Sequence, residues 1–132
     1  MLETAINTTA KILLLLGSFN AALAVILGAF GAHALKLKLS EQMMNVYQTG
    51  VQYHFYHAIG LLIIGVVALH LPASSWLKWS GWLMFSGIIL FSGSLYMLAL
   101  TNIRWLGAIT PVGGTAFILA WSLLAFAIVK SS

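Results

Sequence analysis

The sequence is poor in charge: its 132 residues include six Lys or Arg, two Glu and no Asp, so that only 6% of the chain is charged. An average soluble domain is about 25% charged and about half apolar, whereas 61% of this chain is hydrophobic. Eight charges cannot cover a globule of this size, which excludes a soluble monomer. The same composition excludes disorder, because disordered chains are poor in apolar residues.

The chain also contains no cysteine, which excludes disulfides, thiolate metal sites and cysteine nucleophiles. The net charge of +4 would suit a nucleic acid only if the basic residues formed a run or a stripe. They are instead scattered, at positions 11, 36, 38, 78, 104 and 130. Each lies at or near the end of an apolar stretch, as Lys and Arg do when they flank membrane helices. The predicted partner is therefore a lipid bilayer and not a nucleic acid.

Four apolar stretches each approach or exceed the length of about 20 residues that a helix needs to cross a bilayer. They cover residues 12–35, 50–71, 80–100 and 106–129. Backbone polar groups in lipid must be satisfied within a segment, so each stretch is predicted to be a helix. The predicted fold class is all-α: residues 1–132 form a single polytopic membrane domain, a bundle of four transmembrane helices with both termini on one side.

The connections between the spans differ in character. Ser40 is the predicted N-cap of a helix that has Glu41 in its first turn and continues to Leu71. Such a helix would be about 46 Å long and would extend beyond the bilayer core. The second connection, residues 72–79, is short and carries two tryptophans that are typical interfacial anchors.

The basic residues do not predict an orientation in the membrane. One side carries Lys11, Lys78 and Lys130, and the other carries Lys36, Lys38 and Arg104. The tie of three against three leaves the positive-inside rule without an answer.

Small residues recur along one face of the first span. They are Gly17, Ala21, Ala24, Gly28 and Gly31, spaced by four, three, four and three. Small residues let helix backbones approach closely in lipid, so this seam is predicted to pack against another helix. Asn20 lies near the same face, because eleven residues separate it from Gly31 and eleven residues nearly close three helical turns. We expect Asn20 to hydrogen-bond to a neighbouring helix.

The fourth span opens with Thr110 as a predicted N-cap and Pro111 at the first helical position. Alternatively, the helix begins near Trp105 and breaks at Pro111, and a broken helix near the membrane surface can bind an ion or a polar group. If the helix begins at Thr110, Gly113 and Gly114 would allow a neighbouring helix to approach closely. The seam of the first span is a candidate for that neighbour.

Polar and ionisable residues gather on one side of the predicted bundle. They are His33, Tyr53, His54, His57, Tyr96, Arg104 and Thr110, with Pro111 at the start of the fourth helix. Such residues are costly within a span and tend to mark function. One interpretation is structural, with Tyr and His bonded to headgroups, loops and one another. A second is a ligand pocket for a lipid, a quinone or another amphipathic molecule.

A third interpretation is a metal or haem site that uses His33, His54 or His57. Histidine is the commonest metal ligand, and the spacing of three residues between His54 and His57 places both on one helix face.

Four ordered motifs carry a resemblance to a known family. They are Gly28-Ala-Phe-Gly-Ala-His-Ala-Leu35, Tyr53-His54 with His57, Phe91-Ser-Gly-Ser-Leu-Tyr96, and Ile109-Thr-Pro-Val-Gly-Gly114. Over nearly the whole chain, the sequence resembles the uncharacterised small membrane proteins of the YgdD and YwdK type in bacteria, which are related to eukaryotic transmembrane protein 256. The resemblance implies a four-helix protein of the bacterial inner (plasma) membrane and no established activity. It places His33, His57, Tyr96 and Pro111 inside the motifs.

We therefore predict a non-enzymatic integral membrane protein, without a cofactor and able to form a homo-oligomer, that binds a lipid or small amphipathic ligand on the His33/His57 side. A histidine-ligated metal or haem protein is one alternative, and a small transporter is another. Glu3 and Glu41 lie outside all predicted spans, so proton coupling in a transporter would depend on histidine, whose ordinary pKa near 6.5 permits it. The spacing of Ser, Tyr and His indicates no catalytic triad.

Overall fold

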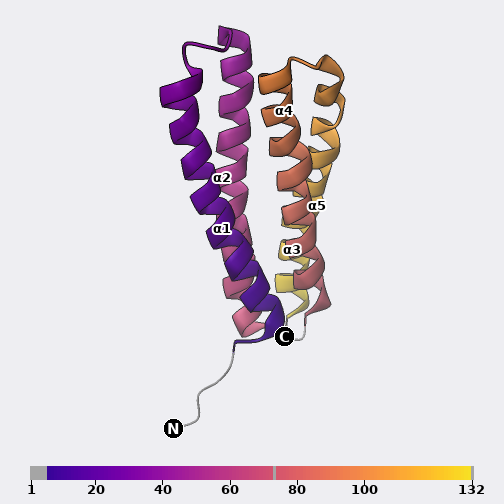
Figure 1. Cartoon of the computed structure of the whole chain (residues 1–132). Coiled ribbons are helices and arrows are strands. Elements are labelled where there is room, and N and C mark those ends of the chain that lie inside the picture. Colours follow the sequence, from indigo (N-terminus) through magenta and orange to yellow (C-terminus); the bar gives the residue numbers. More distant parts are fainter. Residues whose placement is uncertain (1–5, 73, 132) are drawn as a thin grey trace.

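The computed structural model describes residues 6–72 and 74–131 and shows a bundle of long helices (Figure 1). Within those residues, four helices are long and apolar enough to cross a membrane. They cover Thr8–Leu35, Glu41–His70, Ser75–Thr101 and Arg104–Lys130. The predicted all-α class and the four spans are confirmed. Of the two acids, Glu41 begins the second helix, and Glu3 lies outside the described residues.

The bundle has two distinct ends. α1 begins and α5 finishes at one end (Figure 1), as an even number of spans requires. We call this the terminal end, and we call the opposite end, where α1 connects to α2, the loop end.

The first two spans form a helical hairpin. α1 covers Thr8–Phe30 and continues through a π-helical segment, η1 (Gly31–Leu35). α2 covers Glu41–His70. Ser40 caps α2, because its Oγ accepts a hydrogen bond from the backbone N–H of Met43 at 3.1 Å, which confirms the predicted N-cap. With 30 residues, α2 is about 45 Å long and exceeds the bilayer core.

The third span has three parts, α3 (Ser75–Gly87), the π-helical η2 (Ile88–Ser92) and α4 (Gly93–Thr101). The prediction of a connection at residues 72–79 is too long, because α3 already begins at Ser75. Ser74 caps α3 by accepting from the backbone N–H of Leu77 at 3.4 Å, so the two interfacial tryptophans lie in the first turns of the helix. π-helical insertions inside α-helices are frequent at functional sites, which draws attention to η2.

The fourth span starts differently from either sequence-based alternative. A 3₁₀ turn, η3 (Arg104–Ala108), leads directly into α5 (Thr110–Lys130). Pro111 lies in the first turn of α5 as predicted, but the prediction of Thr110 as N-cap is wrong. The residue before it already has helical backbone angles, and the Thr110 hydroxyl lies 2.6 Å from Ser94 Oγ of α4. Thr110 therefore joins two helices instead of capping one.

The four spans pack as two neighbouring pairs. α1 lies along α2, α5 lies along the third span, and α2 also contacts the third span (Figure 1). The seam of α1 faces α2. A Cβ added to Gly17 would lie 3.0 Å from the carbonyl oxygen of Ala58, and a Cβ added to Gly28 would lie 3.3 Å from the side chain of Val51. Gly31 likewise abuts the ring of Tyr47. Of the two alanines of the seam, Ala24 is buried and Ala21 is half-buried.

The two glycines of α5 have a different neighbour from the one expected. A Cβ on Gly113 would lie 2.8 Å from the carbonyl carbon of Leu90 and closer still to the backbone nitrogen of Phe91. A Cβ on Gly114 would meet only the Phe91 ring, at 3.8 Å. The close neighbour of Gly113 is therefore η2 and not the seam of α1, because α5 packs along the third span.

Buried apolar side chains from all four spans meet in the half of the bundle nearer the terminal end. They include Leu13, Leu61, Ile64, Met84, Phe117 and Leu124. Buried polar side chains lie mostly farther along their helices toward the loop end. They are Asn20, His54, His57, Ser92 and Ser94, with Ser80 inside the apolar half.

Candidate functional site

A buried histidine connects three of the spans. His54 of α2 is 2% exposed. Its Nδ1 lies 2.9 Å from the hydroxyl of Tyr96 on α4, and its Nε2 lies 2.9 Å from Oδ1 of Asn20 on α1. The expectation that Asn20 bonds to a neighbouring helix is confirmed. We call these three side chains the His54 network.

The hydrogen bonds of the network run in one direction. Asn20 Nδ2 donates to the carbonyl of Leu16 at 2.8 Å, so Oδ1, which can only accept, is the atom that faces His54. Nε2 of the imidazole must then carry the proton and donate. In the neutral ring Nδ1 is an acceptor, and it accepts a hydrogen bond from the hydroxyl of Tyr96. Each member therefore has a partner, as buried polar groups in lipid require.

Two further side chains hold the helices around the network. Tyr47 of α2 donates its hydroxyl to the carbonyl of Leu27 on α1 at 2.5 Å, and its ring centroid lies 5.4 Å from that of Tyr96. Ser92 of η2 donates to the carbonyl of Gly50 on α2 at 2.7 Å. The sequence reasoning missed both residues. Tyr47 could have been found, because it precedes His54 by seven residues and so lies on the same helix face.

A cleft of about 260 Å³ adjoins the network on the side of α1 and η2. Its walls are apolar and come from Leu23 and Leu27 on one side and from Ile88 and Ile89 on the other, and the network lines it as well. Gly93 also lines the cleft, and a Cβ placed there would meet no atom within 4 Å. The cleft therefore combines apolar walls, free space and polar groups.

A larger hollow of about 530 Å³ lies elsewhere on the α1–α2 pair, next to Val25, Val51 and Phe55. Its lining includes no member of the His54 network. The larger hollow has Gln52 and Tyr56 as its polar lining. We regard the smaller cleft as the candidate site, because its polar lining is the hydrogen-bonded network that connects three spans.

His57 and Tyr53 serve a different contact. His57 Nδ1 lies 2.7 Å from the carbonyl of Tyr53, one turn earlier on α2. The imidazole stacks on Phe117 of α5, with centroids 3.5 Å apart, and Tyr53 packs on Phe91 at 4.5 Å. These rings join α2 to η2 and α5, and neither residue lines the cleft.

The remaining predicted site residues lie apart from the network. His33, Arg104 and Pro111 are exposed. In the part of the chain that the structure describes, no three His, Asp or Glu side chains are grouped so that they could hold a metal ion. The three histidines of the metal or haem alternative do not converge: both ring nitrogens of His54 are engaged within the network, and His33 is exposed on η1. The structure thus brings together only His54 and Tyr96 of the predicted set, and it adds Asn20.

The outer surface of the bundle is apolar. Large side chains such as Leu15, Phe19 and Ile118 are 61%, 66% and 68% exposed, whereas the amide of Asn20 and the imidazole of His54 are buried. This distribution suits a lipid surround, in which exposed apolar groups are stable and polar groups must find internal partners.

Four apolar helices with exposed apolar and buried polar side chains define a polytopic helical membrane protein. The chain belongs to the family described as "Protein of unknown function (DUF423)", which matches residues 27–114, and the resemblance inferred from its motifs is confirmed. It is 52% identical over 120 residues to the UPF0382 membrane protein YwdK of Bacillus subtilis, covering 91% of this chain and 98% of that protein. A UPF0382 membrane protein of Staphylococcus epidermidis is 49% identical, covering 91% and 97%. No solved structure matches the chain.

Proposed function

We propose that this chain is a non-enzymatic protein of the bacterial inner membrane that binds a hydrophobic chain of an amphipathic lipid in the cleft beside the His54 network. The observation that supports the proposal is the cleft itself, which has apolar walls from two spans and the network of His54, Tyr96 and Asn20 among its lining. These residues belong to membrane-spanning helices, so the molecules that surround them are lipids.

The size of the cleft limits what it can hold. Pockets for drug-sized ligands measure about 300–1,000 Å³, and this cleft of about 260 Å³ is smaller. It therefore suits a segment of an acyl or similar chain and not a whole phospholipid.

The network favours an occupant that carries a hydrogen-bond donor. The Tyr96 hydroxyl donates a hydrogen bond to His54, and the oxygen of Tyr96 can still accept one. A hydroxyl on the occupant is such a donor. A single-chain lipid with a hydroxyl headgroup, such as a monoacylglycerol, is therefore a suitable probe.

The buried hydroxyls support a binding role over a catalytic one. Ser80 donates to the carbonyl of Ala120 at 2.6 Å, and Ser92 donates to the carbonyl of Gly50 at 2.7 Å. Both hydroxyl protons are therefore committed to backbone groups. His54 is likewise engaged at both nitrogens and has no lone pair available to act as a general base.

The variant Gly93→Leu is expected to block the cleft. Gly93 has a helical backbone, with φ −59° and ψ −44°, and a Cβ there would meet no atom within 4 Å. We therefore expect a leucine side chain at this position to extend into the cleft and the helix to keep its fold. We expect labelling by a monoacylglycerol with a diazirine in its acyl chain to fall about tenfold or more. The measurement is photo-crosslinking in phosphatidylcholine vesicles, with mass-spectrometric mapping of labelled Leu23 and Ile89.

Gly93→Ala is the matched control, because it also removes the glycine but adds only one methyl group and should keep most of the labelling. Unlabelled monoacylglycerol should compete with the probe at a saturable site. If Gly93→Leu is labelled as strongly as the parent protein, or if competition is absent, the probe reports only general lipid contact and the proposal is wrong.

A further inference from the structure

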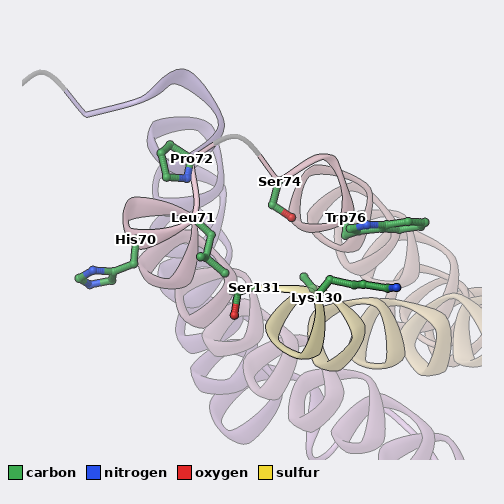
Figure 2. A pocket seen from close by; sticks show the side chains of 8 residues that line it. His70, Leu71, Pro72, Ser74, Trp76, Lys130 and Ser131 are labelled. Carbon is green, nitrogen blue, oxygen red and sulfur yellow. The ribbon is translucent and has the colours of Figure 1, made fainter.

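A second hollow lies at the terminal end and is separate from the cleft. It has a volume of about 420 Å³ and is lined by the connection between α2 and α3 and by the last turn of α5 (Figure 2). Ser74 and Trp76 contribute from the start of α3, and Lys130 and Ser131 contribute from the end of α5. Leu71 provides an apolar wall.

Two aromatic rings indicate the depth of this hollow in the membrane. Trp76 packs edge-on against Phe126, with centroids 4.8 Å apart. The ammonium of Lys130 lies 5.4 Å from the centroid of the same Phe126 ring, and in Figure 2 the Lys130 side chain extends beneath the indole of Trp76. Tryptophan and lysine at the end of a span are typical of the headgroup level of a bilayer. The hollow is therefore placed where lipid phosphates lie.

The charge around the hollow is positive. Lys130 is the cation among the residues that line it, and Lys78 lies on α3 near the same end. The single acid between residues 6 and 131 that the structure describes is Glu41, which begins α2 at the loop end. Among residues 6–72 and 74–131, no acidic side chain therefore lies near Lys130, and an anionic ligand would complement its charge.

The hollow also offers hydrogen-bond donors. Trp76 has an indole N–H and lies in the first turn of α3, where Ser74 Oγ accepts the backbone N–H of Leu77 and the N–H groups before it have no helical acceptor. The Lys130 ammonium has three donors. This combination of a cation and N–H groups beside an apolar wall matches a phosphate that carries hydrocarbon.

We propose that this hollow binds the phosphate of an anionic membrane lipid, with Lys130 as its charge partner. The leaflet supplies the ligand at the right depth, and the apolar wall at Leu71 covers the first part of its glycerol and acyl groups. The site is independent of the cleft beside His54, which takes a hydrophobic chain and has no cation in its lining.

The test is a lipid titration of the whole protein in mild detergent, followed by native mass spectrometry. We expect the first phosphatidylglycerol to bind about fivefold more tightly than phosphatidylcholine, the gain that one lysine supplies near an anionic surface. Lys130→Gln should remove this preference, and Lys130→Arg should keep it. Lys78→Gln is the matched control, because Lys78 has the same charge at the same end but lines a different hollow, and it should keep the preference.

Three results would overturn the proposal. The parent protein could bind the two lipids equally. Lys78→Gln and Lys130→Gln could reduce the preference equally, which would show a diffuse effect of charge without a site. Sodium phosphate at a tenfold molar excess over the lipid could displace phosphatidylglycerol, which would assign the hollow to free phosphate instead of a lipid.

Discussion

Gly113→Ala should lower the free energy of unfolding by about 3 kcal/mol, whereas Gly114→Ala should leave it within about 1 kcal/mol of the parent value. The two glycines are adjacent in α5 but differ in what a methyl group would meet. At Gly113 it would lie 2.8 Å from backbone atoms of Leu90 and Phe91, which cannot rotate away as a side chain can. At Gly114 it would make only an ordinary contact with a ring at 3.8 Å.

The measurement is unfolding by sodium dodecyl sulfate in mixed micelles, followed by circular dichroism. Both variants replace glycine by alanine in one helix, so the gain in helix propensity is the same in each. The difference in stability between them therefore reports the clash at Gly113. Equal stability of the two variants would show that α5 does not approach η2 closely at Gly113.

The same variant should also affect the cleft. Gly113 packs against η2, and η2 supplies Ile88 and Ile89 to the wall of the cleft. A shift of η2 away from α5 would therefore change the cleft, and Gly113→Ala should alter the pattern of diazirine labelling even where the protein stays folded.

The four spans were predictable because the lipid bilayer sets the length and polarity of a helix that crosses it. A helix that crosses a bilayer needs a long apolar stretch, and the chain has four such stretches. The start of α3 was not predictable in this way. Trp76 and Lys78 have the polarity of a loop, yet interfacial residues at the end of a span are helical too, and the capping hydroxyl of Ser74 was the informative signal.

The candidate site was predictable only in part, because topology gives the depth of a residue in the membrane and not its direction around the helix. His33 and Arg104 share a membrane side with His54 but lie on exposed surfaces. The periodicity of α2 identifies the buried face that carries His54. The partner of Asn20, in contrast, depends on how α1 rotates against α2, and no pattern within one helix contains that information.

His54→Leu should lower the free energy of unfolding by about 2–3 kcal/mol, the second large effect that we expect. The substitution removes two hydrogen bonds at once and leaves the amide oxygen of Asn20 and the hydroxyl of Tyr96 without their partner inside an apolar bundle. An orphaned buried polar group costs more than the net value of the bond it made. The measurement is the same unfolding titration, with His70→Leu as a control, since His70 is exposed and its loss should leave the unfolding midpoint unchanged.

The triple variant Asn20→Leu, His54→Leu, Tyr96→Phe distinguishes a bonded network from three independent packing contacts. If the cost of His54→Leu comes from orphaned partners, replacing those partners by apolar groups of similar shape should recover about half of the lost stability. Independent contacts would instead make the triple variant less stable than any single one. A network confirmed in this way would mean that its hydrogen bonds hold α1, α2 and α4 together beside the cleft. It would also mean that the Tyr96 hydroxyl, which donates to His54, has its oxygen available to accept a hydrogen bond from an occupant.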